Sequence, residues 1–416
     1  MIITPMIRNN ICLNSHPAGC VKVVNDQISY VTKTLALGKN PADARAQAPT
    51  GTPRLALIVG CSTGYGLASR IAAGFGYGTA TVGVSYEKAG TSTKPGTPGF
   101  YNNQAFDRAA AAAGLASETL DGDAFSSDMK TQAIAAIKRV AKAASLPAKI
   151  DLVVYSLASP VRVDPVDGSM YRSVIKPIGK PYSGLAMDVL SGQLSPVSVD
   201  PATEDEIAQT VKVMGGEDWS LWMDALKAAD LLSQDVRTVA YSYLGPELSW
   251  GIYKEGTIGR AKEHLEKTAR DWNERLCSGG GGAWVSINKA LVTRSSAVIP
   301  IISLYISSLF KVMKEAGTHE GCIEQLIRLY RDRLYSPASL TDAAKVPVDS
   351  EGRIRVDDWE MRPEIQEKTQ ALMGRITEEN LNELADVAGF RHDFMETHGF
   401  DVAGVDYDAD IDPSGL

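Results

Sequence analysis

The chain has 416 residues, of which 44% are hydrophobic and 22% are charged, and its formal net charge is −8. This composition is that of a globular protein, and the length allows one large domain or two to three ordinary ones. The acidic balance and the lack of a basic block exclude nucleic acid and anionic membranes as expected partners.

The five cysteines form an odd, scattered set, which favours a reducing cytoplasm over a disulfide framework. The first ten residues lack the apolar core of a signal peptide, and the most apolar run, 297–310, is too short to cross a bilayer. We therefore expect a cytoplasmic protein without membrane insertion. Cys12, His16 and Cys20 lie four residues apart, but no further ligand is close, so we expect buried thiols beside a loop histidine and no metal.

The first fifty residues begin with β-like pieces and continue with turns, so we predict an N-terminal β extension over 1–50. Residues 54–60 (RLALIVG) then form an apolar run with little alternation, as in a strand covered on both faces. Three glycines follow this strand and precede a helical spacing, at Gly60, Gly64 and Gly66. Such a turn leaves backbone N–H groups free to hold a phosphate. The alternative is a tight turn without a ligand.

A second strand is predicted at 79–85 and ends at Glu87. An acidic residue about twenty positions beyond a glycine loop lies where the 2′-hydroxyl of an adenosine ribose binds. A carboxylate there repels a 2′-phosphate, which favours NADH over NADPH, although the neighbouring Lys88 weakens this preference. The alternative is an exposed loop carboxylate.

Helices at 102–113 and 127–143 alternate with a strand at 150–155, and this rhythm predicts a doubly wound parallel sheet. The ligand cleft of such a sheet lies at the carboxyl ends of its strands. Asp123 falls in one of these strand-end turns, where it either accepts a hydrogen bond from an adenine amino group or caps the next helix.

Residues 161–235 interrupt the rhythm, with a mostly β stretch up to 201 and then helices, the first of which begins with a capping box at 203–206. This stretch is predicted to be an insertion, and the family resemblance described below implies that it covers the substrate. Apolar residues 301–316 are predicted to form a buried helix that lines an acyl pocket. Residues 319–416 are predicted to be a C-terminal helical extension of the same lobe, with helices near 319–334, 361–373 and 377–387.

A strand predicted at 236–244 leads to Tyr253 and Lys262. The pKa of a tyrosine is about 10, and a nearby ammonium lowers it. Nine residues on one unbroken helix would place the two side chains on opposite faces, so the chain must bend between them. Gly256 and Gly259 allow such a bend. The alternative is a packing tyrosine and a solvated helix lysine.

Taken together, the glycine loop, Glu87 and the Tyr253–Lys262 spacing resemble the trans-2-enoyl-CoA reductase family, which is also described as the V-type (FabV) enoyl-[acyl-carrier-protein] reductases. The resemblance extends along nearly the whole chain. It includes the stretches GCSTGYGLASRIA, ETLDGDAFS, LVVYSLASPVR, YSYLGPEL, GTIGRAK, NKALVT and LFKVMKEAGTHEGCIEQL.

The resemblance implies one Rossmann-type domain over 1–416, similar to the short-chain dehydrogenases/reductases, that reduces the C2=C3 bond of enoyl-CoA or enoyl-acyl-carrier protein with NADH in fatty acid synthesis. It implies that Tyr253 stabilises an enolate and supplies a proton. Lys262 would bind the nicotinamide ribose and tune Tyr253, and Tyr243 would bind substrate near the carbonyl. Tyr241 is expected to face the other side of the strand. We expect a monomer or weak homodimer.

The resemblance also implies a set of cofactor contacts from the strand-end loops. They are Gly60, Ser62, Gly64, Tyr65, Gly66, Tyr86, Glu87, Asp123, Ala124, Leu157, Ala158, Lys262, Val292 and Thr293.

Two positions depart from the family pattern. Gly251 stands two residues before Tyr253, where a proline is usual, and is expected to loosen the backbone there. Arg294 replaces a neutral polar residue and would tighten diphosphate binding or admit NADPH. A carbonyl or alcohol dehydrogenase on the same fold and a non-catalytic NAD-binding regulator are the alternatives.

Overall fold

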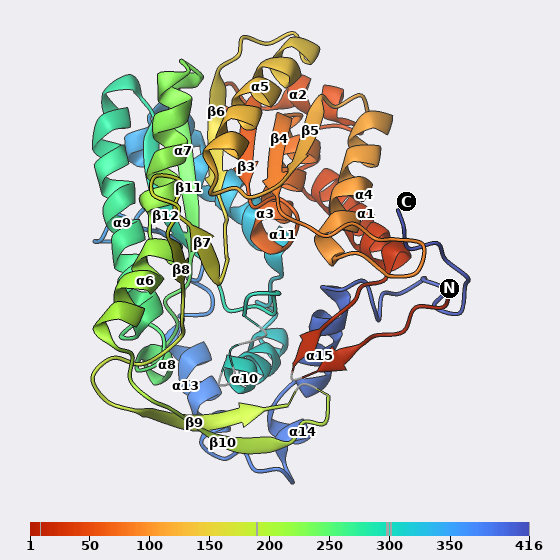
Figure 1. Ribbon diagram of the computed structural model, residues 1–416, viewed down its shortest axis with the longest axis vertical. Helices are drawn as coiled ribbons and strands as arrows, with labels where there is room; N and C mark the ends of the chain where they lie inside the picture. The colour runs from red at the N-terminus through yellow and green to blue at the C-terminus, as the bar shows by residue number, and fades with distance from the viewer. Residues whose placement is uncertain (9, 189, 297–298, 300–301, 416) are drawn as a thin grey trace.

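The computed structural model describes residues 1–8, 10–188, 190–296, 299 and 302–415. Among them, seven parallel strands form the central sheet (Figure 1) in the order β5-β4-β3-β6-β11-β12-β13. The strands are β3 (Leu55–Val59), β4 (Ala80–Ser85), β5 (Ser117–Asp121), β6 (Ile150–Tyr155), β11 (Leu232–Ser242), β12 (Gly282–Ile287) and β13 (Ile354–Arg355). The chain winds outward from β3 in one direction and from β6 in the other, so the predicted doubly wound sheet is confirmed.

Helices cover both faces of this sheet because successive side chains of each strand point to opposite sides. In β3, Ala56 and Ile58 enter one core, while Leu55, Leu57 and Val59 enter the other. The first core is covered by α1 (Pro17–Leu35), α3 (Gly64–Ile71), α4 (Pro98–Ala112) and α11 (Cys322–Leu329). The second is covered by α5 (Ser127–Ala143), α7 (Glu217–Ala228) and α9 (Thr257–Leu276).

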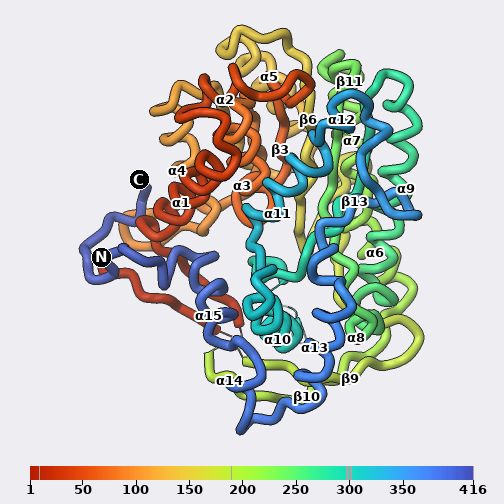
Figure 2. Tube along the Cα trace, turned by 180° about the vertical axis from the view of Figure 1, so that it is seen from behind, coloured from red at the N-terminus to blue at the C-terminus, as the bar shows by residue number. Residues whose placement is uncertain are grey.

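A second lobe with its own apolar core lies beyond the carboxyl ends of the strands (Figures 1 and 2). Its elements come from the insertion, from the segment just before Tyr253 and from the last third of the chain. They are β9 (Tyr182–Met187), β10 (Leu194–Val199), α8 (Glu247–Trp250), α10 (Ile302–Glu315), α13 (Pro363–Met373), α14 (Leu381–Leu384) and α15 (Val387–Glu396). The start of the predicted apolar run, at 297–298 and 300–301, lies outside the described residues.

The remaining strands and α-helices complete the fold. They are β1 (Ile7–Arg8), β2 (Ile11–Cys12), α2 (Pro41–Gln47), β7 (Val161–Val163), β8 (Met170–Arg172), α6 (Glu204–Met214) and α12 (Pro337–Thr341). The capping box predicted for α6 is present, since Thr203 and Glu206 exchange side-chain-to-backbone hydrogen bonds. None of the helices in the described part of the chain has the length and apolar character needed to span a bilayer.

The prediction of a β extension over 1–50 was wrong, because β1 and β2 are two residues each and α1 and α2 occupy most of the segment. The helix α1 starts at Pro17, where the missing N–H costs nothing, and the ring of His16 accepts from Gly19 N at 3.3 Å. Val24 and Val31, seven residues apart, bury its inner face. His16 therefore lies at the end of the loop 13–16 and caps the helix that follows, while Cys12 and Cys20 are buried as predicted.

The C-terminal region is helical as predicted, but its last helices are displaced along the chain. The predicted helix at 377–387 is reduced to α14, and α15 forms over 387–396. Asp386 caps α15 by accepting from Gly389 N at 2.8 Å, and Phe390 and Phe394 bury one face of it. This four-residue apolar spacing accounts for the helix.

One buried ion pair connects α5 to α7 beneath the sheet edge. Lys130 Nζ lies 2.7 Å from Asp218 Oδ1 and also donates to the carbonyl oxygens of Ala124 and Phe125. Burial lowers the pKa of Lys130 and raises that of Asp218, and Tyr155 donates to the second carboxylate oxygen. The pair therefore anchors the strand-end turn that follows β5.

Replacing Asp218 with alanine should strongly destabilise the fold, because it leaves the Lys130 charge buried without its partner. We expect a loss of about 3 to 5 kcal/mol in the free energy of unfolding, measured by urea denaturation. Asp26→Ala removes the exposed Lys22–Asp26 pair and serves as the control, with little expected change. Equal stability of the two variants would contradict this role of the buried pair.

Candidate active site

The glycine-rich turn lies at the carboxyl ends of the neighbouring strands β3 and β6, from which the chain winds in opposite directions. Gly60 has φ of +90° and Gly64 has φ of +54°, which is a backbone conformation that favours glycine. A Cβ on Gly60 would lie 2.3 Å from the carbonyl oxygen of Ser156, and one on Gly66 would lie 1.8 Å from that of Gly60. These close approaches bring the start of α3 to the crevice between the two strands. The helix has no side-chain cap at Thr63, so its first N–H groups fit a dinucleotide phosphate.

Glu87 lies at the end of β4, beside this turn, with a side chain that is 8% exposed. Ser62 Oγ donates to its Oε1 at 2.6 Å, and Glu87 N donates to Asp121 Oδ1 at 2.7 Å. The guanidinium of Arg294 lies 3.5 Å from both carboxylate oxygens. Arg294 therefore pairs with Glu87 across the turn and partly neutralises it.

The loop after β12 forms the opposite wall. A cavity of about 480 Å³ runs between this loop, the start of α3 and the helices α1, α11 and α15. Gly64, Val292 and Thr293 are three predicted cofactor contacts that line it, together with Arg294. A Cβ on Gly64 would lie 3.9 Å from Thr293 Cγ2, so the two sides of the crevice nearly touch there.

The other predicted cofactor contacts differ in how their side chains are used. The hydroxyl of Tyr65 donates to Lys289 O at 2.9 Å inside the core, which leaves its backbone to face the turn. Tyr86 is 78% exposed at the end of β4. Leu157 and Ala158 follow β6 directly, beside the Gly60 turn.

Asp123 and Ala124 form the turn after β5. Asp123 Oδ1 accepts from Phe125 N at 2.9 Å, while Ser126 caps α5 by accepting from Met129 N. The capping role that the sequence left open for Asp123 therefore belongs to Ser126. Ala124 is buried beneath the same turn.

Tyr253 and Lys262 meet at the end of β11 because the chain bends between them as predicted. Gly256 precedes α9, and a Cβ on Gly259 would lie 1.7 Å from Lys254 O, so only glycine lets the Tyr253 loop fold onto the helix. Gly259 N donates to Tyr253 O at 3.0 Å. Lys262 Nζ lies 5.5 Å from the centre of the Tyr253 ring.

Burial controls the ionisation of both groups. It lowers the pKa of Lys262 to about 8, against a smaller opposing effect of Glu266. It raises the pKa of Tyr253, so the expected lowering by Lys262 is not found. The ammonium faces the Tyr253 ring and donates to Ser242 Oγ at 2.9 Å, which explains why it does not stabilise the phenolate.

Tyr243 and Tyr241 face different sides of the sheet, as predicted. Tyr243 packs its ring edge-on to Tyr253, with centroids 5.4 Å apart, and its hydroxyl donates to Glu360 Oε1 at 3.3 Å. Tyr241 faces the other side of the sheet, where its hydroxyl lies 2.6 Å from Ser69 Oγ. Tyr241 is therefore a packing residue of the α3 face.

Sequence reasoning missed three residues that surround Lys262 and Tyr243. Ser242 could have been found from strand alternation, since it follows Tyr241 in β11 and therefore faces the opposite side of the sheet, toward α9. Glu360 and Tyr305, whose hydroxyl donates to Glu360 Oε1 at 2.6 Å, gave no local signal. Glu360 lies 117 positions from Tyr243, and only the folded chain brings them together.

Gly251 packs closely against Tyr182, a residue of the insertion. A Cβ at this position would lie 3.0 Å from the Tyr182 ring of β9, whose hydroxyl donates to Leu248 O at 3.3 Å. On the other side of Tyr253, Thr257 N donates to Lys176 O at 3.0 Å. The insertion therefore contacts the Tyr253 loop at both ends, which replaces the local rigidity that a proline would give.

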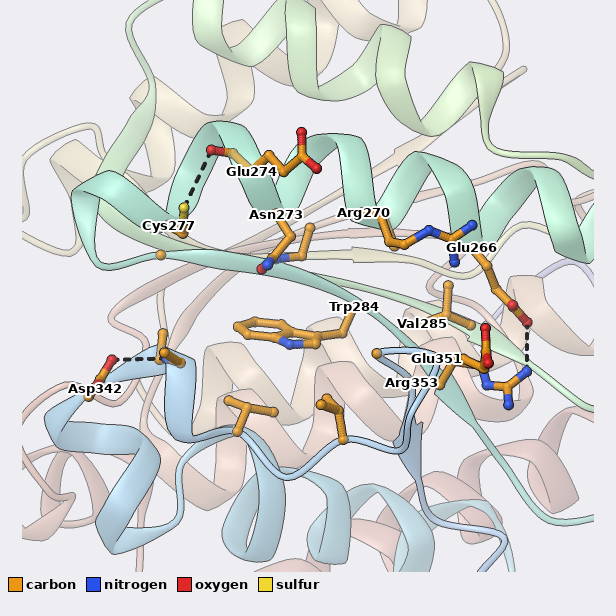
Figure 3. Close-up of a pocket in the computed structure, with 18 of the residues that line it drawn as sticks. Glu266, Arg270, Asn273, Glu274, Cys277, Trp284, Val285, Asp342, Glu351 and Arg353 are labelled. Atoms are coloured by element: carbon orange, nitrogen blue, oxygen red, sulfur yellow. Dashed lines mark hydrogen bonds and ion pairs between the residues drawn. The ribbon is translucent and has the colours of Figure 1, made fainter.

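A separate cavity of about 360 Å³ lies behind the catalytic helix, between α9 and residues 342–353 (Figure 3). Trp284 forms its floor, and Glu266 pairs with Arg353 at 3.6 Å at one end. Its described lining includes none of the predicted site residues. Glu266 lies one turn beyond Lys262 and acts on its charge, which connects this cavity to the site.

The sheet order, the glycine turn and the buried Tyr253–Lys262 pair define a Rossmann-type reductase. Residues 94–335 match the model of the trans-2-enoyl-CoA reductase catalytic region, and residues 2–92 match that of the NAD(P)H binding domain of the same enzymes. Residues 348–411 match a model described as the enoyl reductase FAD binding domain. The chain therefore belongs to the trans-2-enoyl-CoA reductase family.

Named relatives agree over the full length. The chain is 53% identical to trans-2-enoyl-CoA reductase [NADH] of Treponema denticola, over 99% of each chain. It is 49% identical to enoyl-[acyl-carrier-protein] reductase [NADH] of Flavobacterium johnsoniae, over 99% of this chain and 97% of the relative. A crystal structure of the Treponema denticola enzyme in complex with NAD superimposes with a TM-score of 0.91 and covers 99% of this chain and 98% of that one.

The C-terminal segment does not fit a flavin, despite the description of its family model. Its strand β13 continues into Val356-Asp-Asp-Trp-Glu360, with no glycine turn to receive a diphosphate. The inward side chains Ile365, Phe390 and Phe394 are buried in the core of the second lobe. This segment instead supplies Glu360 to the site.

Glu87→Gln keeps the shape of the side chain and removes the charge that opposes a 2′-phosphate. We expect the ratio of kcat/KM for NADPH to that for NADH to rise about tenfold, which corresponds to about 1.4 kcal/mol. Equilibrium titration of both nucleotides should show the same shift. Glu118→Gln, which alters an exposed pair on β5, is the control. An unchanged ratio in Glu87→Gln would show that this carboxylate does not select the cofactor.

Proposed function

We propose that this chain catalyses the NADH-dependent reduction of the C2=C3 double bond of trans-2-enoyl thioesters, carried by CoA or by acyl-carrier protein. The observation that carries the proposal is the buried Tyr253–Lys262 pair at the carboxyl edge of the sheet, next to a glycine turn fit for a dinucleotide. The relatives named for this reaction with NADH support it. The free thiols Cys12, Cys20 and Cys61 support a cytoplasmic location.

Each residue of the site has a separate role in the proposed reaction. Bound NADH supplies a hydride to C3 of the thioester, and negative charge develops on the thioester oxygen. The hydroxyl of Tyr253 makes no hydrogen bond within the described part of the chain, so it is free to donate to this oxygen and then to give up its proton. Burial removes competing water and strengthens that interaction.

Lys262 and the second lobe complete the arrangement. The Lys262 ammonium, directed by Ser242, would hold the nicotinamide ribose hydroxyls and keep a positive charge near the developing enolate. Helix α10 buries apolar residues such as Leu304, Leu309 and Phe310 beside Tyr253 and Tyr243 in the same core. Such surroundings suit an acyl chain better than a polar substrate.

Tyr253→Phe should lower kcat for crotonyl-CoA by about 100-fold or more, since it removes the proton donor while keeping the ring. The measurement is the consumption of NADH. Tyr241→Phe is the matched control, because that hydroxyl faces Ser69 across the sheet, and its kinetics should stay near those of the wild type. No turnover by the wild type would contradict the proposed function, and NADH consumption with a 3-ketoacyl-CoA alone would indicate a carbonyl reductase.

The rate should depend on the charge of Lys262. Because burial sets the pKa of Lys262 to about 8, the ammonium is present below that pH and is lost above it. We expect kcat/KM to fall as the pH rises through about 8. The pKa of Tyr253 is raised, so this tyrosine does not titrate in that range. Lys262→Arg keeps the charge and should flatten the profile up to pH 10, whereas a flat wild-type profile would argue against a charged Lys262.

A further inference from the structure

Glu360 is a buried carboxylate that the reaction described above does not use. It follows β13, has no exposed surface and bridges three segments of the chain. Its Oε1 accepts from the hydroxyls of Tyr305 at 2.6 Å and Tyr243 at 3.3 Å. Its Oε2 accepts from Ala290 N at 2.7 Å. Every hydrogen bond made by this carboxylate therefore comes from a donor fixed in the core.

These contacts determine where the proton of Tyr243 points. An ionised carboxylate can only accept hydrogen bonds, and a phenol has a single proton to donate. In the structure the Tyr243 hydroxyl donates to the charged Glu360 Oε1 at 3.3 Å, and in this arrangement it offers only lone pairs to other neighbours. The hydroxyl of Tyr253, whose ring lies against that of Tyr243, has no such partner among the described residues.

The surroundings of Glu360 keep it ionised at neutral pH. Burial raises its pKa to about 6, and the nearby Lys289 charge and the Tyr305 and Ala290 hydrogen bonds limit that rise, while Asp357 adds to it. Tyr243 faces the same carboxylate from β11. The ammonium of Lys289 is held by Ala290 O at 3.0 Å and lies 4.8 Å from the centre of the Phe310 ring.

We propose that Glu360 is a positioning residue that commits the proton of Tyr243 away from the substrate, unlike the substrate contact that the resemblance implies for this hydroxyl, and so leaves Tyr253 as the single proton donor. The inference rests on the proposed function and deepens it. It predicts that Tyr243, although adjacent to Tyr253, becomes a competent donor once Glu360 stops accepting its proton.

Glutamine at position 360 tests this directly, because its orientation is dictated by the backbone. Ala290 N requires an acceptor, so the amide oxygen must occupy the place of Oε2. The amide NH₂ group then faces Tyr243 and Tyr305 and donates to them. Glu360→Gln therefore reverses the polarity of these hydrogen bonds while it keeps the shape of the side chain, and the Tyr243 proton becomes free.

The experiment measures NADH consumption with crotonyl-CoA in the Tyr253→Phe background. We expect the double variant Tyr253→Phe/Glu360→Gln to be about tenfold faster than Tyr253→Phe alone. This gain corresponds to about 1.4 kcal/mol of barrier. Adding Tyr243→Phe should abolish the gain. A double variant that is as slow as Tyr253→Phe, or a gain that survives the loss of Tyr243, overturns the proposal.

A pH profile gives a second readout that does not require a substitution at position 360. In Tyr253→Phe the residual rate should rise as the pH falls through about 6, because protonated Glu360 accepts one hydrogen bond fewer. The profile of Tyr253→Phe/Glu360→Gln should be flat in this range. A Tyr253→Phe rate that is flat or falls towards low pH overturns the proposal even if the Glu360 variant does not fold.

Glu320→Gln is the matched control for the loss of a buried carboxylate. Glu320 is 5% exposed and pairs with Arg328 at 2.7 Å, outside the Tyr243 contacts. Introduced into Tyr253→Phe, it should lower the unfolding temperature without raising the rate, and an equal gain would overturn the proposal. The assay of the wild type distinguishes the role of Glu360 from the proposed function. If the wild type reduces crotonyl-CoA but Glu360→Gln does not speed up Tyr253→Phe, the role of Glu360 is wrong and the proposed function stands.

Discussion

The close contact of α3 with β3 and β6 is the constraint on which the site depends. Gly60 lies against the carbonyl of Ser156, and Gly66 lies against that of Gly60, at separations that leave no room for a Cβ. A larger side chain at either glycine would push the helix start away from the crevice between the strands. The free N–H groups of α3, the Glu87 carboxylate and the loop after β12 face one another because this contact is so short.

The second lobe supplies contacts to the candidate active site as well as covering it. The insertion contacts the Tyr253 loop through Tyr182 on one side and through Lys176 on the other. The C-terminal segment supplies Glu360, which orients Tyr243. Three regions that are distant in sequence thus fix one reacting group. A site built in this way gains precision, since no single loop has to hold Tyr253 by its own conformation.

The local sequence pattern was sufficient to predict structure wherever neighbouring residues determine the backbone geometry. The parallel sheet follows from apolar strands alternating with helices, and the bend between Tyr253 and Lys262 follows from Gly256 and Gly259. The helix α1 was missed because its signals, a histidine cap and two valines seven residues apart, are weak beside a turn-rich composition. The place of Glu360 in the site could not be predicted, since it depends on a contact with Tyr243, 117 positions away in the sequence. The raised pKa of Tyr253 escaped prediction because burial, a property of the whole fold, outweighs a neighbouring charge.

The two ends of the chain are packed together, as both views show (Figures 1 and 2). The amino group of Met1 donates to Ile411 O at 2.6 Å, and Gly19 of α1 approaches the carbonyl of Gly399 so closely that a Cβ would lie 1.7 Å from it. During synthesis a chain emerges from its amino end at about 5–20 residues per second. The first helix of this protein is therefore released long before its docking partner exists. This contact can form only after residues 399–411 have left the ribosome.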